Sequence, residues 1–300
     1  MDKLRAMRVF VRVVESQSFV RAAESLGILP ATVTQLIQAL EGELRLRLIN
    51  RSTRKFSLTS DGEFYYQACV RVIEEIEDVE ESLHTSAQKP VGRLRVDVSP
   101  AIAYRVIVPN LSDFCEKYPD IELFIGLGDR PVDLVQDAVN CAVRVGDLAD
   151  SSLIARRLAL VHFSICASPA YLLRYGTPQS LSDLSSHHVI RYFSTRSGRV
   201  LDWKWKGDIG DEVKFKHSVF VNDAEACLKG GVAGLGLIMS PKFMVADFIR
   251  SGELKEISLD GVELPELPVS IVYPAGINSL PKVRCFSDWL FSVFSEVDGF

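Results

Sequence analysis

The stretch SFVRAAESLGILPATVTQLIQALEGELRLRL, residues 18–48, decides the N-terminal fold. Apolar side chains recur at helical spacing on both sides of Gly27 and Pro30. Glycine readily adopts the left-handed angles that end a helix, and proline suits the first turn of the next one. Ser18 is placed to cap the first helix through its hydroxyl. The stretch therefore predicts two short helices joined by a tight turn.

The outer face of the second predicted helix carries small and hydrogen-bonding side chains, whereas its apolar residues face inward. This pattern is typical of a helix-turn-helix, whose second helix enters the DNA major groove. Glutamine suits that role because it can bond adenine bidentately. A helical hairpin with a polar solvent face is the alternative. The residues of this helix predicted to contact DNA are Pro30, Ala31, Thr32, Thr34, Gln35 and Gln38.

A short ribbon is predicted directly after the two helices, because residues 48–50 and 56–58 can pair. The tip of this ribbon holds three cations and two hydroxyls. Such a tip suits a wing that contacts phosphates or the minor groove, and a solvated turn is the alternative. The neighbouring helix-turn-helix favours the wing. Its predicted DNA contacts are Arg51, Ser52, Thr53, Arg54 and Lys55.

Charge is distributed unevenly along the 300 residues. The net charge is −5, yet residues 1–60 hold ten Lys and Arg against five Asp and Glu, leaving 24 against 34 in the rest. A basic module on an acidic body concentrates the attraction for phosphate at one end. No apolar run of 18 residues exists, and Arg5, Arg8 and Arg12 interrupt the first apolar segment. We therefore expect no membrane partner, no signal peptide, and a cytoplasmic, nucleoid-associated protein.

Several apparent motifs carry no chemistry. The six cysteines form no CxxC pair, so we expect core residues rather than a metal site or a disulfide framework. The glycine-rich residues 230–236 lie between a predicted helix and a predicted strand, the wrong order for a dinucleotide site. His187 and His188 lack ligands at metal spacing. With no nucleophile–base pair, we expect no enzyme, no catalytic residue and no cofactor. A regulator that senses oxidants through cysteine stays an alternative.

A long helix is predicted over residues 61–89, with Ser60 or Thr59 as its cap. Apolar residues recur along it at alternating intervals of four and three, which indicates a heptad seam with acidic flanks. We interpret it as a dimerising linker helix, the alternative being an amphipathic helix that lies on the body. The predicted seam consists of Tyr65, Cys69, Val72, Ile76, Val79 and Leu83.

Beyond the Lys89–Gly92 breaker the chain alternates predicted strands and helices, which indicates an α/β body with parallel sheets. The predicted strands are residues 94–98, 121–126, 141–145, 158–167, 189–192, 215–221, 235–239 and 269–273. The predicted helices are residues 101–118, 132–138, 224–232 and 282–294.

The chain resembles the LysR-type transcriptional regulators along essentially its whole length. The matching stretches, in order, are MDKLRAMRVFVRVVESQSFVRAAESLGI, VTQLIQALEGEL, RLINRSTRKFSLTSDG, GRLRV, FCEKYPDIEL, DLVQDAVNCAVRVGDL, SSLIARRL, CASPAYL, VNDAEACLKGGVAGLGLIMSP and YPAGINSLPKVRCFSDWL. The resemblance implies an α/β protein with an N-terminal all-α winged helix-turn-helix. A long linker helix then leads to a two-lobed effector domain of the type 2 periplasmic-binding-protein kind. The expected boundaries are 1–60 for the DNA-binding domain, 61–89 for the linker and 90–300 for the effector domain, with lobe one at 91–162 and 268–300 and lobe two at 163–267.

The sequence departs from the family pattern at a few positions. Arg45 stands where the family usually has a glycine after the LExEL pattern. Thr34 and Gln35 stand where the family commonly has Ser and Arg. Asn140 replaces an aspartate that usually precedes a strand. These departures affect the turn into the wing and the identity of the operator.

The resemblance places an effector between the two lobes, and the strand pattern agrees, because ligands bind at the carboxyl ends of parallel strands. Hydroxyls at these ends can bond a carboxylate, so we expect a small, anionic metabolite. Each residue alone also fits a cap or a turn, above all Asp223. The predicted effector contacts are Ser99, Pro100, Ala101, Arg144, Gly146, Phe193, Ser194, Thr195 and Asn222. The resemblance further implies a homo-oligomer, expected to be a tetramer, on an inverted-repeat operator in double-stranded DNA.

Overall fold

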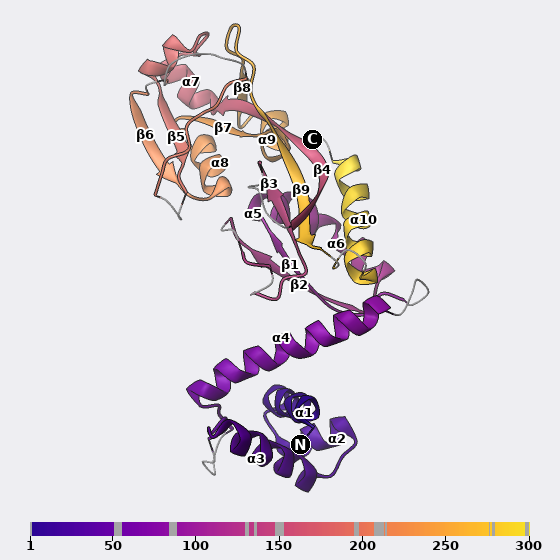
Figure 1. The fold of residues 1–300 in the computed structure, drawn as a ribbon. Coiled ribbons are helices and arrows are strands. Elements are labelled where there is room, and N and C mark those ends of the chain that lie inside the picture. Colours follow the sequence, from indigo (N-terminus) through magenta and orange to yellow (C-terminus); the bar gives the residue numbers. More distant parts are fainter. Residues whose placement is uncertain are drawn as a thin grey trace. The chain divides into compact units, whose positions relative to one another are not determined.

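The computed structural model divides into two compact units, residues 1–87 and 88–300 (Figure 1). Each unit is considered by itself. The structure describes the chain except residues 1, 51–55, 84–88, 130–131, 135–136, 148–152, 195–197, 207–212, 214, 276, 278–279 and 298–299.

The first unit is helical, with helices α1 (Lys3–Ser16), α2 (Phe19–Leu26), α3 (Pro30–Leu44) and α4 (Ser60–Leu83). One apolar core joins all four helices, because each contributes one face to it. Its fully buried members include Phe10, Ala22, Leu40, Leu48 and Cys69. Burial of this apolar area, worth about 25 cal/mol per Å², holds the unit together.

The joint between α2 and α3 forms as the sequence predicts. The Ser18 hydroxyl accepts a hydrogen bond from the Arg21 N–H at 3.3 Å and so caps α2. Gly27 ends α2 with φ of 64°, in the left-handed region, and Pro30 is the first residue of α3. These three residues confirm the predicted helix-turn-helix.

A short ribbon links α3 to α4. Ile49 bridges Leu58 in antiparallel fashion. The Thr59 hydroxyl accepts from the Gly62 N–H at 2.9 Å, so Thr59 caps α4. Gly62 packs against the ribbon so closely that an added Cβ would lie 2.0 Å from the Leu48 carbonyl oxygen. The predicted ribbon is therefore present at its base, whereas its tip, residues 51–55, lies outside the described residues.

The second unit is built on a mixed sheet whose strands run in the order β2-β1-β3-β9-β4-β7-β5-β6, with β8 paired to β4. The strands are β1 (Gly92–Val98), β2 (Ile121–Leu127), β3 (Cys141–Val145), β4 (Leu153–Ala167), β5 (His188–Tyr192), β6 (His217–Val221), β7 (Leu237–Pro241), β8 (Lys255–Ile257) and β9 (Glu266–Pro274). Pairing is parallel for β2-β1-β3 and for β7-β5-β6. The sheet is not wholly parallel as expected, because β9 runs antiparallel to both β3 and β4.

Two long strands, β4 and β9, join the two halves of this unit and lie side by side in Figure 1. Strand β4 pairs with β9 up to His162 and with β7 from Phe163 onward. We call the part around β1, β2 and β3 lobe one and the part around β5, β6 and β7 lobe two. Because β4 pairs with β9 along its first part and with β7 along its last part, it belongs to both lobes and connects them.

Helices cover both lobes. Lobe one carries α5 (Pro100–Ile102), the π-helical turn Ala103–Ile107, α6 (Val108–Lys117) and α10 (Pro281–Glu296). Lobe two carries α7 (Pro169–Tyr175), a 3-10 turn (Ser182–Ser186), α8 (Ala224–Val232) and α9 (Lys242–Arg250). None of the helices in the described parts of the chain is long and apolar enough to cross a membrane.

Two local predictions differ from the structure. The helix predicted over residues 101–118 contains a π-helical turn, in which the Val108 N–H bonds the Ala103 carbonyl. Pro109 has no N–H, so in a regular α-helix the carbonyl four residues before it would lack its hydrogen-bond donor. The helix predicted over residues 132–138 is wrong at its described residues. Leu134, Asp137 and Ala138 form turns, with Ala138 at a φ of 52°, and residues 132–133 have no regular structure.

Candidate DNA interface and effector cleft

The outer face of α3 is the centre of the candidate DNA interface. Thr32 is half-buried, and the other predicted contacts on this helix, Pro30, Ala31, Thr34, Gln35 and Gln38, are exposed. The Thr34 hydroxyl donates to the Pro30 carbonyl at 3.1 Å. Since this bond occupies the Thr34 proton, Gln35 and Gln38 are the side chains on this face with amide donors and acceptors to offer.

A hollow of about 470 Å³ opens beside this face, between the start of α2, α3 and the ribbon. Besides Thr34 and Gln38, its polar lining includes Gln17, Ser18 and Asn50. Gln17 ends α1 with a φ of 50°. The sequence patterns missed Gln17 and Asn50 as interface candidates, because both lie between elements where no periodicity marks an exposed face.

A buried carboxylate fixes the ribbon to α3. Glu41, on α3, is 7% exposed, and its Oε1 accepts from the Leu48 N–H at 2.8 Å and from the Ile49 N–H at 3.3 Å. Bonds from backbone N–H groups to a carboxylate are stronger than neutral ones. Glu41 therefore sets the position of the ribbon relative to the exposed face of α3.

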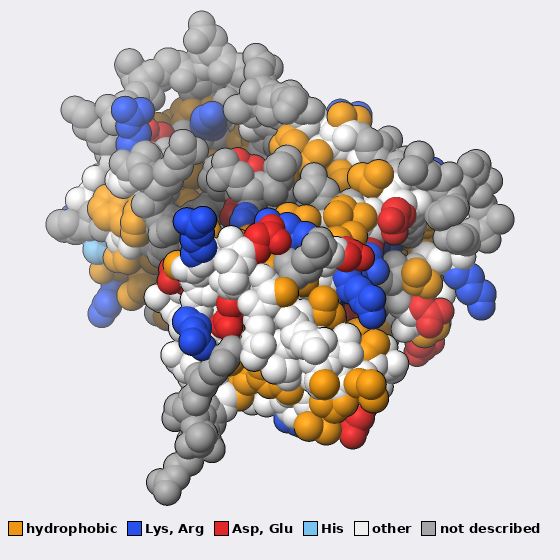
Figure 2. Space-filling model, turned by 60° about the horizontal axis from the view of Figure 1, so that its bottom comes forward, with side chains coloured by type: hydrophobic (Ala, Val, Ile, Leu, Met, Phe, Trp, Pro, Cys, Tyr) orange, Lys and Arg blue, Asp and Glu red, His pale blue; other side chains and the backbone are white. Residues whose placement is uncertain are grey.

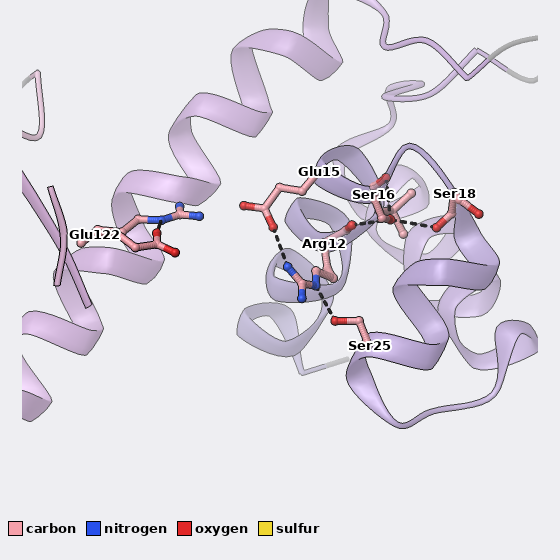
Figure 3. A network of polar contacts seen from close by, with 8 residues as sticks. Arg12, Glu15, Ser16, Ser18, Ser25 and Glu122 are labelled. Atoms are coloured by element: carbon pink, nitrogen blue, oxygen red, sulfur yellow. Dashed lines mark hydrogen bonds and ion pairs between the residues drawn. The ribbon is translucent and has the colours of Figure 1, made fainter. Parts of the chain in front are cut away.

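Cations of the helical unit link its helices, as Figure 3 shows for Arg12. The Arg12 Nε donates to the Ser25 hydroxyl at 2.6 Å, which ties α1 to α2, and Arg12 also pairs with Glu15 at 3.2 Å. Lys3 pairs with Glu43 of α3 at 2.9 Å. On the one face of the molecule drawn in Figure 2, blue and red side chains are interspersed rather than gathered by sign.

Exposed cations also occur, among the described residues, on the segments next to α3 in the chain. Arg21 lies on α2, and Arg45 and Arg47 lie between α3 and the ribbon; all three are exposed. Arg45 ends α3 with φ of 55°, the left-handed conformation that glycine usually supplies. The sequence prediction did not include these three, although they belong to its basic first module. The predicted wing cations Arg51, Arg54 and Lys55, with Ser52 and Thr53, lie outside the described residues.

The predicted seam on α4 falls into two parts. Tyr65 packs against the core of the helical unit and Cys69 is buried within it. Val72 is 41% exposed and Val79 is 54% exposed, and Phe64 on the same helix is 76% exposed. Ile76 is half-buried, and the side chain of Leu83 lies outside the described residues. The apolar surface that α4 offers to a partner therefore lies on Phe64, Val72 and Val79.

The lobe-one residues of the predicted effector site gather at the carboxyl ends of β1 and β3. Ser99 is 8% exposed and precedes α5, without a capping bond from its hydroxyl. Ala101 packs against an apolar cluster of lobe two. Arg144 forms an ion pair with Asp97 and donates to the Asp97 carbonyl at 3.2 Å. Gly146 has a φ of 104°, and its N–H bonds the Pro268 carbonyl at 2.8 Å.

The lobe-two residues of this site lie at the ends of β5 and β6. The Phe193 N–H donates to the Val221 carbonyl at 2.8 Å, which places Phe193 and Ser194 beside Asn222. Asp223 caps α8, accepting from the Ala226 N–H at 2.7 Å. Thr195 lies outside the described residues. The structure therefore brings the described members from each lobe together at the carboxyl edges of that lobe's parallel strands.

Among the described residues, two pairs of polar side chains link the lobes. The Tyr192 hydroxyl, in lobe two, donates to Asp129 Oδ2, in lobe one, at 2.8 Å. Burial, together with that carboxylate, raises the pKa of Tyr192. Arg105 reaches Glu225 with two bonds of 2.7 and 2.9 Å, and its guanidinium lies 5.6 Å from the centre of the Phe248 ring.

A second hollow, of about 600 Å³, lies where β4 changes partners. Its floor includes the buried side chains of Ile165, Ile257 and Leu259. Its rim includes Lys242, which lies 3.7 Å from Glu256, and Ser258. The sequence patterns did not point to this hollow, since it arises from the separation of β7 and β9.

The cysteines whose pKa is shifted lie in buried environments that make the thiol less reactive. Burial raises the pKa of Cys69 to about 11 and those of Cys166 and Cys227 to about 12, and it raises the pKa of Cys141 as well. A raised pKa keeps a thiol protonated and unreactive at neutral pH. Cys115 is exposed and Cys285 is half-buried. Within the part of the chain that the structure describes, no group of three metal-binding side chains occurs.

Two family models match the chain. The model "Bacterial regulatory helix-turn-helix protein, lysR family" matches residues 4–63, and the model "LysR substrate binding domain" matches residues 87–295.

Curated relatives and solved structures are similar over almost the whole chain. An HTH-type transcriptional repressor of Pseudomonas aeruginosa is 37% identical, across 99% of this chain and 93% of its own. The HTH-type transcriptional activator AaeR of Escherichia coli is 34% identical, across 99% and 96%. The structure of CrgA, a LysR-type transcriptional regulator from Neisseria meningitidis, is 30% identical with a TM-score of 0.63, across 97% of this chain and 99% of its own.

Proposed function

The chain belongs to the LysR family of transcriptional regulators, and we propose that a small-molecule effector bound between the lobes of its second unit controls how it binds DNA. The helix-turn-helix and the substrate-binding domain are the family's two parts. The observation that carries the proposal is the convergence of the predicted effector residues from both lobes at the carboxyl edges of their strands.

We propose that α3 reads the bases of an inverted-repeat operator. Gln35 and Gln38 present free amides on the exposed face of this helix, and amides suit adenine edges. Arg21, Arg45, Arg47 and the cations of the wing supply phosphate contacts, which position the protein without reading sequence. The protein acts in the cytoplasm, on the nucleoid.

The effector that we propose is a small polar metabolite that touches Ser99. The nearly buried Ser99 hydroxyl makes no capping bond, so it is available to a ligand. Arg144, the cation of the predicted set, already pairs with Asp97. The described residues therefore give less support to an anion than the sequence did, and the proposal rests on hydrogen bonding.

A pair of matched substitutions tests the location of the effector. The full chain is screened against small metabolites for a rise in melting temperature, and each hit is repeated with Ser99→Trp and Ser258→Trp. An indole at position 99 fills the cleft, whereas one at position 258 fills the hollow at the crossover strands. We expect Ser99→Trp to abolish the rise and Ser258→Trp to keep it. The reverse result would place the effector in the crossover hollow and contradict the proposal.

We further propose that the protein is a homotetramer. The exposed apolar side chains of α4 offer one two-fold interface, and a second interface between substrate-binding domains would close the assembly. The acidic flanks of α4 oppose its pairing, because like charges repel. The α4 contact alone is therefore expected to be weak, which is why a second interface is needed.

A further inference from the structure

The two polar contacts that link the lobes within the described part of the chain differ in strength. Arg105 and Glu225 form a two-bond, charge-assisted pair whose side chains are only 27% and 18% exposed. Such bidentate pairs are the strong ones. Tyr192 and Asp129 form a single bond of 2.8 Å from a neutral donor, and Asp129 is exposed to water. The second contact is therefore the easier one to break.

Packing reinforces the first contact. Arg105 lies over the ring of Phe248 in α9, and nearby Ala101 packs against the apolar cluster of lobe two. Phe243, also in α9, packs against the clusters of both lobes. Separating the lobes here would expose apolar surface as well as break an ion pair, so this contact is expected to persist as the lobes move.

The second contact stands at the proposed effector cleft. Asp129 follows β2, whose parallel neighbour β1 leads into Ser99. Tyr192 ends β5, next to Phe193 and the turn at Asn222. Movement of the lobes about the Arg105–Glu225 contact therefore changes the Tyr192–Asp129 separation.

We propose that Tyr192 and Asp129 form a latch that holds the cleft closed in the absence of effector, while Arg105 and Glu225 form the pivot about which the lobes open. The inference rests on the proposed function, because it assigns roles at the same cleft. Opening breaks one hydrogen bond at the latch and leaves the two bonds of the pivot in place. The free energy of binding an effector in the cleft compensates for the loss of the Tyr192–Asp129 hydrogen bond.

Hydrogen exchange of the full chain without ligand tests the latch. Tyr192→Phe removes one hydroxyl, and Asp129→Ala removes its acceptor. We expect either variant to speed amide exchange about three- to tenfold in residues 121–129 and 188–194, as the loss of about one hydrogen bond implies. Exchange in α8 should not change. Asp129→Asn keeps an acceptor oxygen and should remain close to native.

Controls separate the latch from a general loss of stability. Tyr175→Phe removes a tyrosine hydroxyl from α7, outside the cleft, and should leave both segments unchanged. Arg105→Gln should speed exchange in α8, as loss of the pivot requires. The double variant Tyr192→Phe/Asp129→Ala should add little to either single change, because both remove the same bond. Unchanged exchange in both single variants, or additive effects in the double variant, would overturn the latch. Failure to bind DNA would contradict the proposed function and leave this result standing.

Discussion

Gly62 occupies a position where no side chain fits. A Cβ at this residue would lie 2.0 Å from the Leu48 carbonyl oxygen, and the backbone there is fixed by the pairing of the ribbon. We expect Gly62→Ala to destabilise the helical unit by about 2–3 kcal/mol, because the clash is with backbone rather than with a flexible side chain. Native-state hydrogen exchange of the α3 and α4 amides measures this loss.

Gly42 provides the matched control. It is exposed within α3 and has nothing within 4 Å of an added Cβ. Gly42→Ala should therefore stabilise the same unit by about 0.5–1 kcal/mol, since alanine loses less backbone entropy in a helix. Equal effects of the two substitutions would show that the close approach at Gly62 is absent in solution.

His187 should make the stability of lobe two depend on pH. Its ring is 3% exposed, with Nδ1 3.0 Å from the Tyr171 hydroxyl. Burial lowers the pKa of His187 below its usual 6.5, and the opposing effect of Asp183 is smaller. Below pH 6.5, therefore, His187 is protonated in the unfolded chain but stays neutral in the folded chain until the pH reaches its lowered pKa. The stability that the neutral ring contributes is complete above pH 6.5 and is lost as the pH falls toward the lowered pKa.

Urea unfolding of the native chain and of His187→Gln at pH 7.5 and pH 5.5 tests this dependence. We expect the native midpoint for lobe two to fall more steeply between these values than that of the variant, which has no imidazole to titrate. Parallel pH dependence in the two proteins would mean that His187 does not set it.

At the scale of elements, the proposed assembly rests on α4. Val72 and Val79 are exposed on the helix, so Val72→Asp/Val79→Asp should weaken self-association of the full chain at least tenfold by placing charges in an apolar contact. Gln67→Asp adds a charge at another exposed position of the same helix and serves as the control. Sedimentation at micromolar concentration measures both. A double variant that assembles as tightly as the native chain would contradict the dimerising role of α4.

The helix-turn-helix was predictable because its signals are local. A capping serine, a glycine that ends α2 and a proline that begins α3 each act within a few residues. Arg45 itself adopts the left-handed angle that a glycine usually supplies, so α3 ends in a left-handed residue without a glycine. Asn140 likewise accepts from the Arg95 N–H at 2.8 Å through its side chain, a bond that an aspartate could make.

Features that depend on distant parts of the chain were harder to predict. The heptad pattern on α4 could not distinguish residues that face the chain's own core, such as Cys69, from those that face outward, such as Val79. The bonds between Tyr192 and Asp129 and between Arg105 and Glu225 join residues far apart in sequence. The crossover hollow depends on where one strand changes partners, which periodicity does not record.

At the scale of the whole molecule, each compact unit has its own core and its own proposed partner. For the helical unit the proposed partner is DNA, contacted through the exposed amides of α3. For the α/β unit the proposed partner is an effector bound between its two lobes. The account as a whole depends on α3 reading bases, because control by an effector matters only if the protein selects its operator.

Binding of the full chain and of Gln35→Ala to its mapped operator and to a scrambled duplex tests this claim most directly. Gln35 is exposed on α3, beside a hydroxyl already bonded to its own helix. We predict that Gln35→Ala weakens operator binding by about 1–3 kcal/mol and leaves binding to the scrambled duplex unchanged, since a base contact adds nothing to nonspecific affinity. Equal losses on the two duplexes would contradict base reading by α3.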